Sequence, residues 1–233
     1  MNDSIISRRN FLFGTGVCSV GLLSGCADRA TFETEPSQFS PSEVEDSPYS
    51  ISNKREINLR SLISRIIDRS VPVNATSYFV RYDHDTLPQF AFNLSSPSLS
   101  VFDRELNPLG KEDTDQLFEL LFTVANREDT GITLEEYELI DEQLFETSLG
   151  RETLETYEVV AESTQFGQIL YDCYLLTHNI DSSLIATAGF VIKDIEAFEV
   201  DYSSGYEEQR EIMVQLLSSV DFPVNWEDIT VSQ

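Results

Sequence analysis

Hydrophobic residues beyond position 56 follow two kinds of spacing. Alternating or unbroken runs of β-branched, aromatic and aliphatic residues, which are typical of strands, occupy residues 77–82, 88–94, 98–103, 153–163, 166–177 and 183–193. In the fourth run Tyr157, Val159 and Ala161 point to the same side. Turn residues at 165–167 and 179–181 separate the last three runs. These runs therefore predict an antiparallel meander.

Helical spacing of apolar residues predicts four helices. The first, from residue 57, has an apolar stripe made of Leu59, Leu62, Ile63, Ile66 and Ile67. Two more are expected at 113–124 and 133–145, because Asp113 with Gln116 and Thr133 with Glu136 resemble capping boxes. The last is expected at 206–220, with inward residues Ile212, Met213, Leu216, Leu217 and Val220. This order of elements predicts an α+β domain with helices packed on one face of an antiparallel sheet.

The start of the chain has the pattern of an export signal. Arg8 and Arg9 precede residues 10–27, which carry no charge and contain several glycines, as is typical of a twin-arginine (Tat) signal peptide. Small residues at 24 and 25 precede Cys26. We therefore expect removal of residues 1–25, lipidation of Cys26, and a domain held at the extracytoplasmic face of the cell membrane. An uncleaved membrane helix is the alternative, and it places the domain on the same side.

Composition suggests the limits of the folded part. Residues 26–56 are rich in Thr, Glu, Pro and Ser, so they are interpreted as a disordered acidic tether. A single globular domain is expected at 57–223, followed by a C-terminal tail at 224–233. After lipidation of Cys26, Cys173 is the one remaining cysteine of the mature chain, so no intramolecular disulfide is expected.

The charge balance is strongly acidic. The chain has 15 basic and 41 acidic residues and a net charge of −26. Loss of residues 1–25 removes two arginines and Asp3, which leaves 13 basic and 40 acidic residues and a net charge of −27. Such a domain repels itself in dilute buffer, whereas 1 M salt shortens the Debye length to about 3 Å. We hypothesise a halophilic source, with an ordinary acidic protein as the alternative. Nucleic acid is not an expected partner, because phosphate binding needs a basic face.

Residues 92–110, FNLSSPSLSVFDRELNPLG, carry a resemblance. Its further marks are an isolated Leu149-Gly150, a turn glycine at Gly167 and an apolar strand at 184–192. Together with the lipoprotein start, the chain resembles a family of uncharacterised haloarchaeal Tat-exported lipoproteins built around one domain of unknown function. The resemblance implies a surface-attached protein and no assigned activity.

No catalytic, cofactor or metal site is predicted. His84, Cys173, His178 and Met213 are the residue types of a blue-copper site, but Met213 lies far from His178 in the chain and within an expected helix. His84 has acidic neighbours, but no Gly-x-Ser-x-Gly motif accompanies it. The acidic clusters at 112–115 and 199–201 lack the spacing of a calcium loop. A buried cysteine, a turn histidine and a packed methionine are the simpler interpretation.

Five of the basic residues gather near the start of the domain: Lys54, Arg55, Arg60, Arg65 and Arg69. They favour a domain helix whose arginines pair with acidic groups, with a helix lying on anionic lipid as the alternative. Asn74 and Asn93 begin acceptor triplets for N-glycosylation, and Asn74 is expected in a loop.

The sequence thus predicts a lipid-anchored surface protein with a non-enzymatic binding or envelope role. Its expected partners are the membrane, the Tat machinery and an unidentified extracytoplasmic protein or ligand. An accessory substrate-binding lipoprotein of a transporter and a hydrolase using carboxylates are the alternatives.

Overall fold

The structure, a computed structural model, describes residues 30–58, 73–97, 99–101, 104–106, 132–195 and 203–232. Arg8, Arg9 and Cys26 lie outside these residues, as do the helix expected at 113–124, most of the helix expected from residue 57, and the acidic clusters at 112–115 and 199–201. Among the described residues, no helix is both long and apolar enough to cross a membrane.

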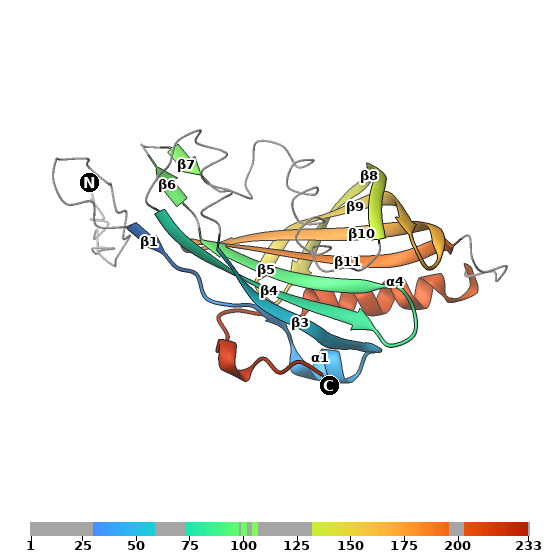
Figure 1. Ribbon diagram of the computed structural model, residues 1–233, viewed down its shortest axis with the longest axis horizontal. Helices are drawn as coiled ribbons and strands as arrows, with labels where there is room; N and C mark the ends of the chain where they lie inside the picture. Colours follow the sequence, from blue (N-terminus) through green and yellow to red (C-terminus); the bar gives the residue numbers. More distant parts are fainter. Residues whose placement is uncertain are drawn as a thin grey trace, which may run out of the picture.

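A twisted, mainly antiparallel sheet dominates the molecule (Figure 1). Its strands are β1 (Ala30–Phe32), β3 (Tyr49–Asn58), β4 (Val73–His84), β5 (Phe90–Pro97), β8 (Ile132–Thr147), β9 (Gly150–Ser163), β10 (Gly167–Ile180) and β11 (Ser183–Ile195). Their order is β1-β4-β5-β11-β10-β9-β8, and β3 pairs with the same edge of β4 as β1 does. The predicted antiparallel arrangement of β9, β10 and β11 is confirmed.

Alternation of side chains along the strands builds two cores, one on each face of the sheet. The first, here called the aromatic core, contains Phe79, Phe90, Phe92, Tyr157, Tyr171 and Phe190 among its buried residues. Phe90 and Phe190, from paired strands, stack with ring centroids 4.4 Å apart. The expected shared face of Tyr157, Val159 and Ala161 is confirmed, because all three belong to this core.

The second core, called the helix-side core, lies beneath α4 (Ser203–Ser218). Met213, Leu216 and Leu217 of α4 pack there among sheet residues that include Tyr82, Ala91, Leu176 and Val191. Gly189 of β11 lets the helix approach closely, since a Cβ at this position would overlap the side chain of Met213. The helix expected at 206–220 is thereby confirmed, but it ends at Ser218, and Val220 lies in the short strand β12 (Val220–Asp221).

The helix expected at 133–145 is wrong, because these residues belong to β8. Tyr137, Ile140 and Leu144 fit a helical spacing, but β8 pairs with β9 along its whole length. Tyr137 also meets Tyr157 of β9 edge to face, with ring centroids 6.4 Å apart. Cross-strand pairing has therefore overridden the local pattern. The remaining described helices, α1 (Pro41–Glu45) and the 3-10 helix η1 (Trp226–Asp228), are short, so the described chain is an antiparallel sheet with few helices.

The disordered tether expected at 26–56 is wrong for the described residues from position 30 on. Short strands and a helix occupy much of this segment, in which β2 (Gln38–Phe39) pairs with β12 (Val220–Asp221). Phe39 and Tyr49 are 1% and 2% exposed. Few apolar residues suffice here, because neighbouring strands satisfy the backbone and two aromatic rings enter the helix-side core.

The expected C-terminal tail also packs on the domain. Ile229 is buried in the helix-side core, and Ser232 N donates to Ile51 O at 2.9 Å. Trp226 contacts the ring of Tyr78 and lies beneath the ammonium of Lys54, 4.8 Å from the ring centroid. Lys54 is part of β3 and not of a basic helix. Its side chain contacts the C-terminal segment.

Candidate functional site

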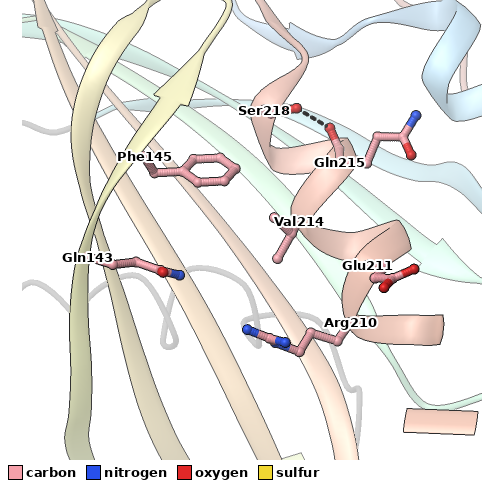
Figure 2. Close-up of a pocket in the computed structure, with 7 residues that line it drawn as sticks. All are labelled: Gln143, Phe145, Arg210, Glu211, Val214, Gln215 and Ser218. Carbon is pink, nitrogen blue, oxygen red and sulfur yellow. Dashed lines mark hydrogen bonds between the residues drawn. The ribbon is translucent and has the colours of Figure 1, made fainter. Parts of the chain in front are cut away.

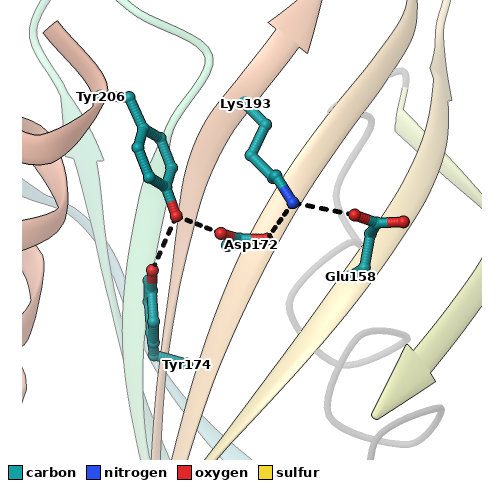
Figure 3. A network of polar contacts seen from close by, with 5 residues as sticks. All are labelled: Glu158, Asp172, Tyr174, Lys193 and Tyr206. Carbon is teal, nitrogen blue, oxygen red and sulfur yellow. Dashed lines mark hydrogen bonds and ion pairs between the residues drawn. The ribbon is translucent and has the colours of Figure 1, made fainter. Parts of the chain in front are cut away.

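A polar network crosses the helix-covered face of the sheet (Figure 3). At its centre is Asp172 of β10, which is 5% exposed. Tyr206 of α4 donates to Asp172 Oδ2, and the hydroxyls of Tyr206 and Tyr174 are 3.1 Å apart. Lys193 Nζ of β11 lies 3.2 Å from Asp172 Oδ1 and 2.8 Å from Glu158 Oε2 of β9. The network joins three strands to the first half of α4.

The electrostatics of the network keep its protons in place. Burial and the hydrogen bond to Asp172 raise the pKa of Tyr206 well above its ordinary value. Its hydroxyl therefore remains a donor at any physiological pH. The hydrogen bond to Glu158 raises the pKa of Lys193, which remains charged. A donor with a raised pKa that faces a buried carboxylate is suited to holding a helix in position.

An open pocket lies between β8 and α4 (Figure 2). It has a volume of about 400 Å³ and is lined by Gln143, Phe145, Arg210, Glu211, Val214, Gln215 and Ser218. Figure 2 shows Gln143 and Phe145 on β8 across from Arg210 and Val214 on α4. Near Ser218, the β8–β9 turn is bound to the helix end, because Ser148 N donates to Ser218 O at 2.8 Å.

Arg210 connects the pocket to the polar network. Its guanidinium interacts electrostatically with Tyr174, and Nη1 lies 3.3 Å from Glu207 Oε2. The side chain is 42% exposed, so it presents charge to solvent on the pocket side. Guanidinium and amide donors beside Phe145 and Val214 form a surface that suits a partly apolar group with hydrogen-bond acceptors.

The strand β8 forms the outer wall of this region, and it is exposed to an unusual degree. Every residue from 138 to 144 is exposed. Leu144 is 73% exposed, Ile140 48% and Leu139 41%. In the described part of the chain, β8 is the last strand on its side of the sheet. Large apolar groups on a terminal strand are typical of a docking surface.

The four residues of the copper hypothesis are not brought together. Cys173 belongs to the aromatic core and Met213 to the helix-side core, on opposite faces of the sheet. Burial raises the pKa of the Cys173 thiol, which disfavours the thiolate that a metal needs. The described residues contain no cluster of three His, Cys, Asp or Glu suited to a metal ion.

Both histidines have structural contacts. His84 Nδ1 accepts the amides of Thr86 and Leu87 at 3.1 and 3.2 Å, so it orders the turn after β4. His178 is buried on β10, with Nδ1 3.9 Å from Glu152 Oε1 and Nε2 3.5 Å from Thr147 Oγ1. Burial lowers the pKa of each imidazole.

The glycosylation predictions need correction. Asn93 is fully buried in β5, so the folded domain does not present it to an enzyme. Asn74 lies in β4, where it pairs with Thr31, and not in a loop.

Sequence reasoning missed the residues of the network and the pocket. Asp172 was visible as a charge inside the apolar run at 166–177, and Lys193 as one of three lysines in the chain. A charge within a buried strand requires a partner, so the sequence could have predicted that Asp172 forms an ion pair or a hydrogen bond. Nothing local marks Tyr206 or Arg210, because their roles depend on the docking of α4.

No family model matches the chain, and no curated protein matches it. Among solved structures, the solution structure of cyanobacterial PsbP (CyanoP) from Synechocystis sp. PCC 6803 matches 86% of this chain and 99% of its own length. The identity is 14% and the TM-score is 0.34. A similarity at this level supports no conclusion about fold or function.

Proposed function

We propose that the chain is an exported, lipid-anchored surface protein that binds another extracytoplasmic protein through β8 and the adjoining pocket. The observation that carries the proposal is the exposure of residues 138–144, which include three large apolar side chains. The same strand lines a pocket of about 400 Å³ through Gln143 and Phe145. Burial of such a surface on binding is favourable by roughly 25 cal/mol per Å² of apolar area.

The proposed location comes from the sequence. Arg8 and Arg9 before an uncharged stretch, and small residues before Cys26, support export and lipid attachment. The acidic balance and the resemblance to haloarchaeal lipoproteins support a high-salt exterior, where concentrated salt screens the self-repulsion of the domain.

Binding is favoured over catalysis by the positions of the reactive residue types. His84 orders a turn, His178 is buried against Thr147, and Cys173 is enclosed in the aromatic core. Tyr206, Asp172 and Lys193 satisfy one another. The pocket beside α4 is instead lined by two amides, one guanidinium, one carboxylate, one hydroxyl and two apolar side chains.

Crosslinking in the native cells tests the binding proposal. A photo-crosslinking amino acid replaces Leu144 in the full chain, and the control carries it at Thr164, an exposed turn residue beyond the other end of β9. We expect an adduct with a second protein from position 144 and none from position 164. Equal adducts from both positions, or none from 144, would refute the β8 surface as the binding site.

The anchor is tested separately. We expect Cys26→Ser to release the exported protein from the membrane fraction. Retention of the Cys26→Ser protein in that fraction would show that lipid on this residue is not the anchor.

The pocket favours one second candidate, an accessory substrate-binding lipoprotein. Its volume lies within the range of small-molecule sites, and Arg210 supplies a cation suited to a carboxylate. A thermal-shift screen of small carboxylic acids, compared with Arg210→Gln, tests it. Stabilisation of the unsubstituted chain alone would support this role, and no stabilisation by any acid would remove it.

A further inference from the structure

We infer that the partner docks as an extended, positively charged segment that adds a strand to β8 along residues 141–147. The inference rests on the proposed function and names the chemistry of the partner.

The backbone of β8 is regular in the stretch concerned. Its register to β9 shifts between Leu134 and Glu136, and again between Leu139 and Asp141. From residue 141 to residue 147 the pairing with β9 runs without a break. A regular terminal strand presents amide and carbonyl groups at the spacing that an incoming strand matches.

Side chains of this stretch offer contacts on both sides of an added strand. Gln143 and Phe145 line the pocket beneath α4. Leu144 alternates with them, so it points to the opposite face of the sheet. Alternate residues of an added strand thus lie beside the pocket or beside Leu144. Specificity in strand addition comes from such alternate contacts.

Charge identifies the class of partner. β8 contains six carboxylates, Glu135, Glu136, Glu138, Asp141, Glu142 and Glu146, and no lysine or arginine. All six are exposed. Within the described residues one of them has an ion pair, between Glu146 and Arg151 of β9 at 2.6 Å. A segment with lysine or arginine at alternate positions complements this strand, because opposite charges on neighbouring strands stabilise the pairing.

A second copy of the chain is disfavoured by the same charges. Antiparallel pairing of two β8 strands brings like charges together in a molecule with a net charge of −26. The repulsion at about 4 Å is roughly 1 kcal/mol for each pair in water. Salt weakens this repulsion and also the attraction to a cationic partner, so the backbone bonds and Leu144 must contribute to affinity at high salt.

Protection of a free edge is the competing explanation. Bulges and charges are common devices that prevent unwanted strand pairing. They account for the first part of β8, where both register shifts lie. They do not account for Leu144, which is 73% exposed in the regular stretch, since a protective edge is expected to be polar there.

Peptide binding tests the inference. Fluorescent decapeptides of alternating arginine and valine, or of alternating glutamate and valine, are titrated into the purified full-length chain while anisotropy is measured. We expect the arginine peptide to bind and the glutamate peptide not to bind. Hydrogen exchange should show amide protection at residues 141–147. An arginine peptide methylated on its four central backbone nitrogens should bind about tenfold more weakly, because it cannot form the ladder.

Matched variants separate strand addition from general attraction to an acidic surface. Leu144→Ala removes the apolar contact without changing the charge and should weaken binding about tenfold, whereas Thr164→Ala shortens an exposed side chain elsewhere and should leave it unchanged. Equal binding of the methylated peptide, equal effects of the two variants, or protection outside β8 would overturn the inference. Crosslinks from position 144 without peptide binding would refute the cationic strand and leave the proposed function standing. Absence of those crosslinks would refute both.

Discussion

Two long strands of the same sheet, β10 and β8, have nearly opposite environments. Of the 14 residues of β10, eight are buried, including the consecutive residues 171–176. Of the 16 residues of β8, none is buried and most are exposed. Both are paired in antiparallel hairpins. Backbone pairing alone therefore does not distinguish a structural strand from one available for recognition.

The difference lies in what covers each strand. β10 is enclosed between the aromatic core and the helix-side core, so residues on both of its faces are apolar. β8 contacts the cores through a few partly buried residues, among them Ile132, Tyr137 and Phe145. The carboxylates of β8 occupy exposed positions, where no apolar side chain is needed to fill a core. The exposed leucines of β8 thus contribute little to folding, which makes them informative about binding.

The sharpest test of this comparison is a pair of leucine truncations. Leu176→Ala on β10 removes a fully buried side chain and should lower the free energy of unfolding by about 3 kcal/mol. Leu144→Ala on β8 should change it by less than about 0.5 kcal/mol. Denaturant titration at fixed high salt measures both. A large loss for Leu144→Ala would mean that β8 is a core strand, and the comparison would fail.

A smaller effect is expected from a methyl group beneath α4. Gly189→Ala places a Cβ against Met213, and overpacking of this kind should cost about 2 kcal/mol. Gly205→Ala is the control, since nothing lies within 4 Å of its Cβ. Gly205 lies in the first turn of α4, where alanine should raise the free energy of unfolding by less than about 1 kcal/mol. Thermal unfolding measures the change in stability of each variant. Stabilisation by both substitutions, or destabilisation by both, would contradict the close approach of α4.

The polar network should contribute less than the apolar packing around it. Tyr206→Phe removes the hydrogen bond to buried Asp172 and should cost about 1.5 kcal/mol. Tyr78→Phe, which keeps the ring contact with Trp226, should change stability by less than about 0.5 kcal/mol. In a double-mutant cycle, Asp172→Asn should cost less in the Tyr206→Phe background than alone. Independent, additive effects would show that the two groups do not interact.

The smallest effect concerns pH. Burial lowers the pKa of His178 and His84 below 6.5, so the unfolded chain takes up protons first as the pH falls. Their contribution to stability is present above pH 6.5 and is lost as the pH falls through the folded-state pKa values. We expect the free energy of unfolding to decrease between pH 7.5 and 6, and His178→Gln to flatten part of this slope.

Glu155 works in the opposite direction. Burial raises the pKa of its carboxyl group above 4.5, so its unfavourable contribution diminishes as the pH falls. Measurements in a Glu155→Gln background isolate the histidines. An unchanged slope in His178→Gln would show that this imidazole is as accessible to protons in the folded state as in the unfolded state.

Most of the sheet was predictable, whereas its margins were not. The runs that became β10 and β11 are continuous and apolar, so they admit few other interpretations. Tyr137, Ile140 and Leu144 fit a helical spacing, and only the pairing with β9 shows that they belong to a strand. Phe39 and Tyr49 stand alone in a polar segment, and their burial depends on strands more than 30 residues away.

The candidate site was less predictable than the fold. Asp172 was visible as a charge inside a strand, but its partners Lys193 and Tyr206 come from β11 and α4. The pocket likewise combines β8, which was expected to be a helix, with α4. Because β8 was expected to be a helix, the pocket that it forms with α4 could not be predicted.

By itself, the amino-acid sequence determined the meander of β9, β10 and β11, the helix α4 and the acidic balance of the chain, because local periodicity and composition are properties of contiguous residues. The tertiary structure alone decided that β8 is a strand, that residues 30–56 complete the sheet, and that Asp172 meets Tyr206. Those outcomes depend on free energy gained when distant segments pair and exclude water together, and no single segment contains that information.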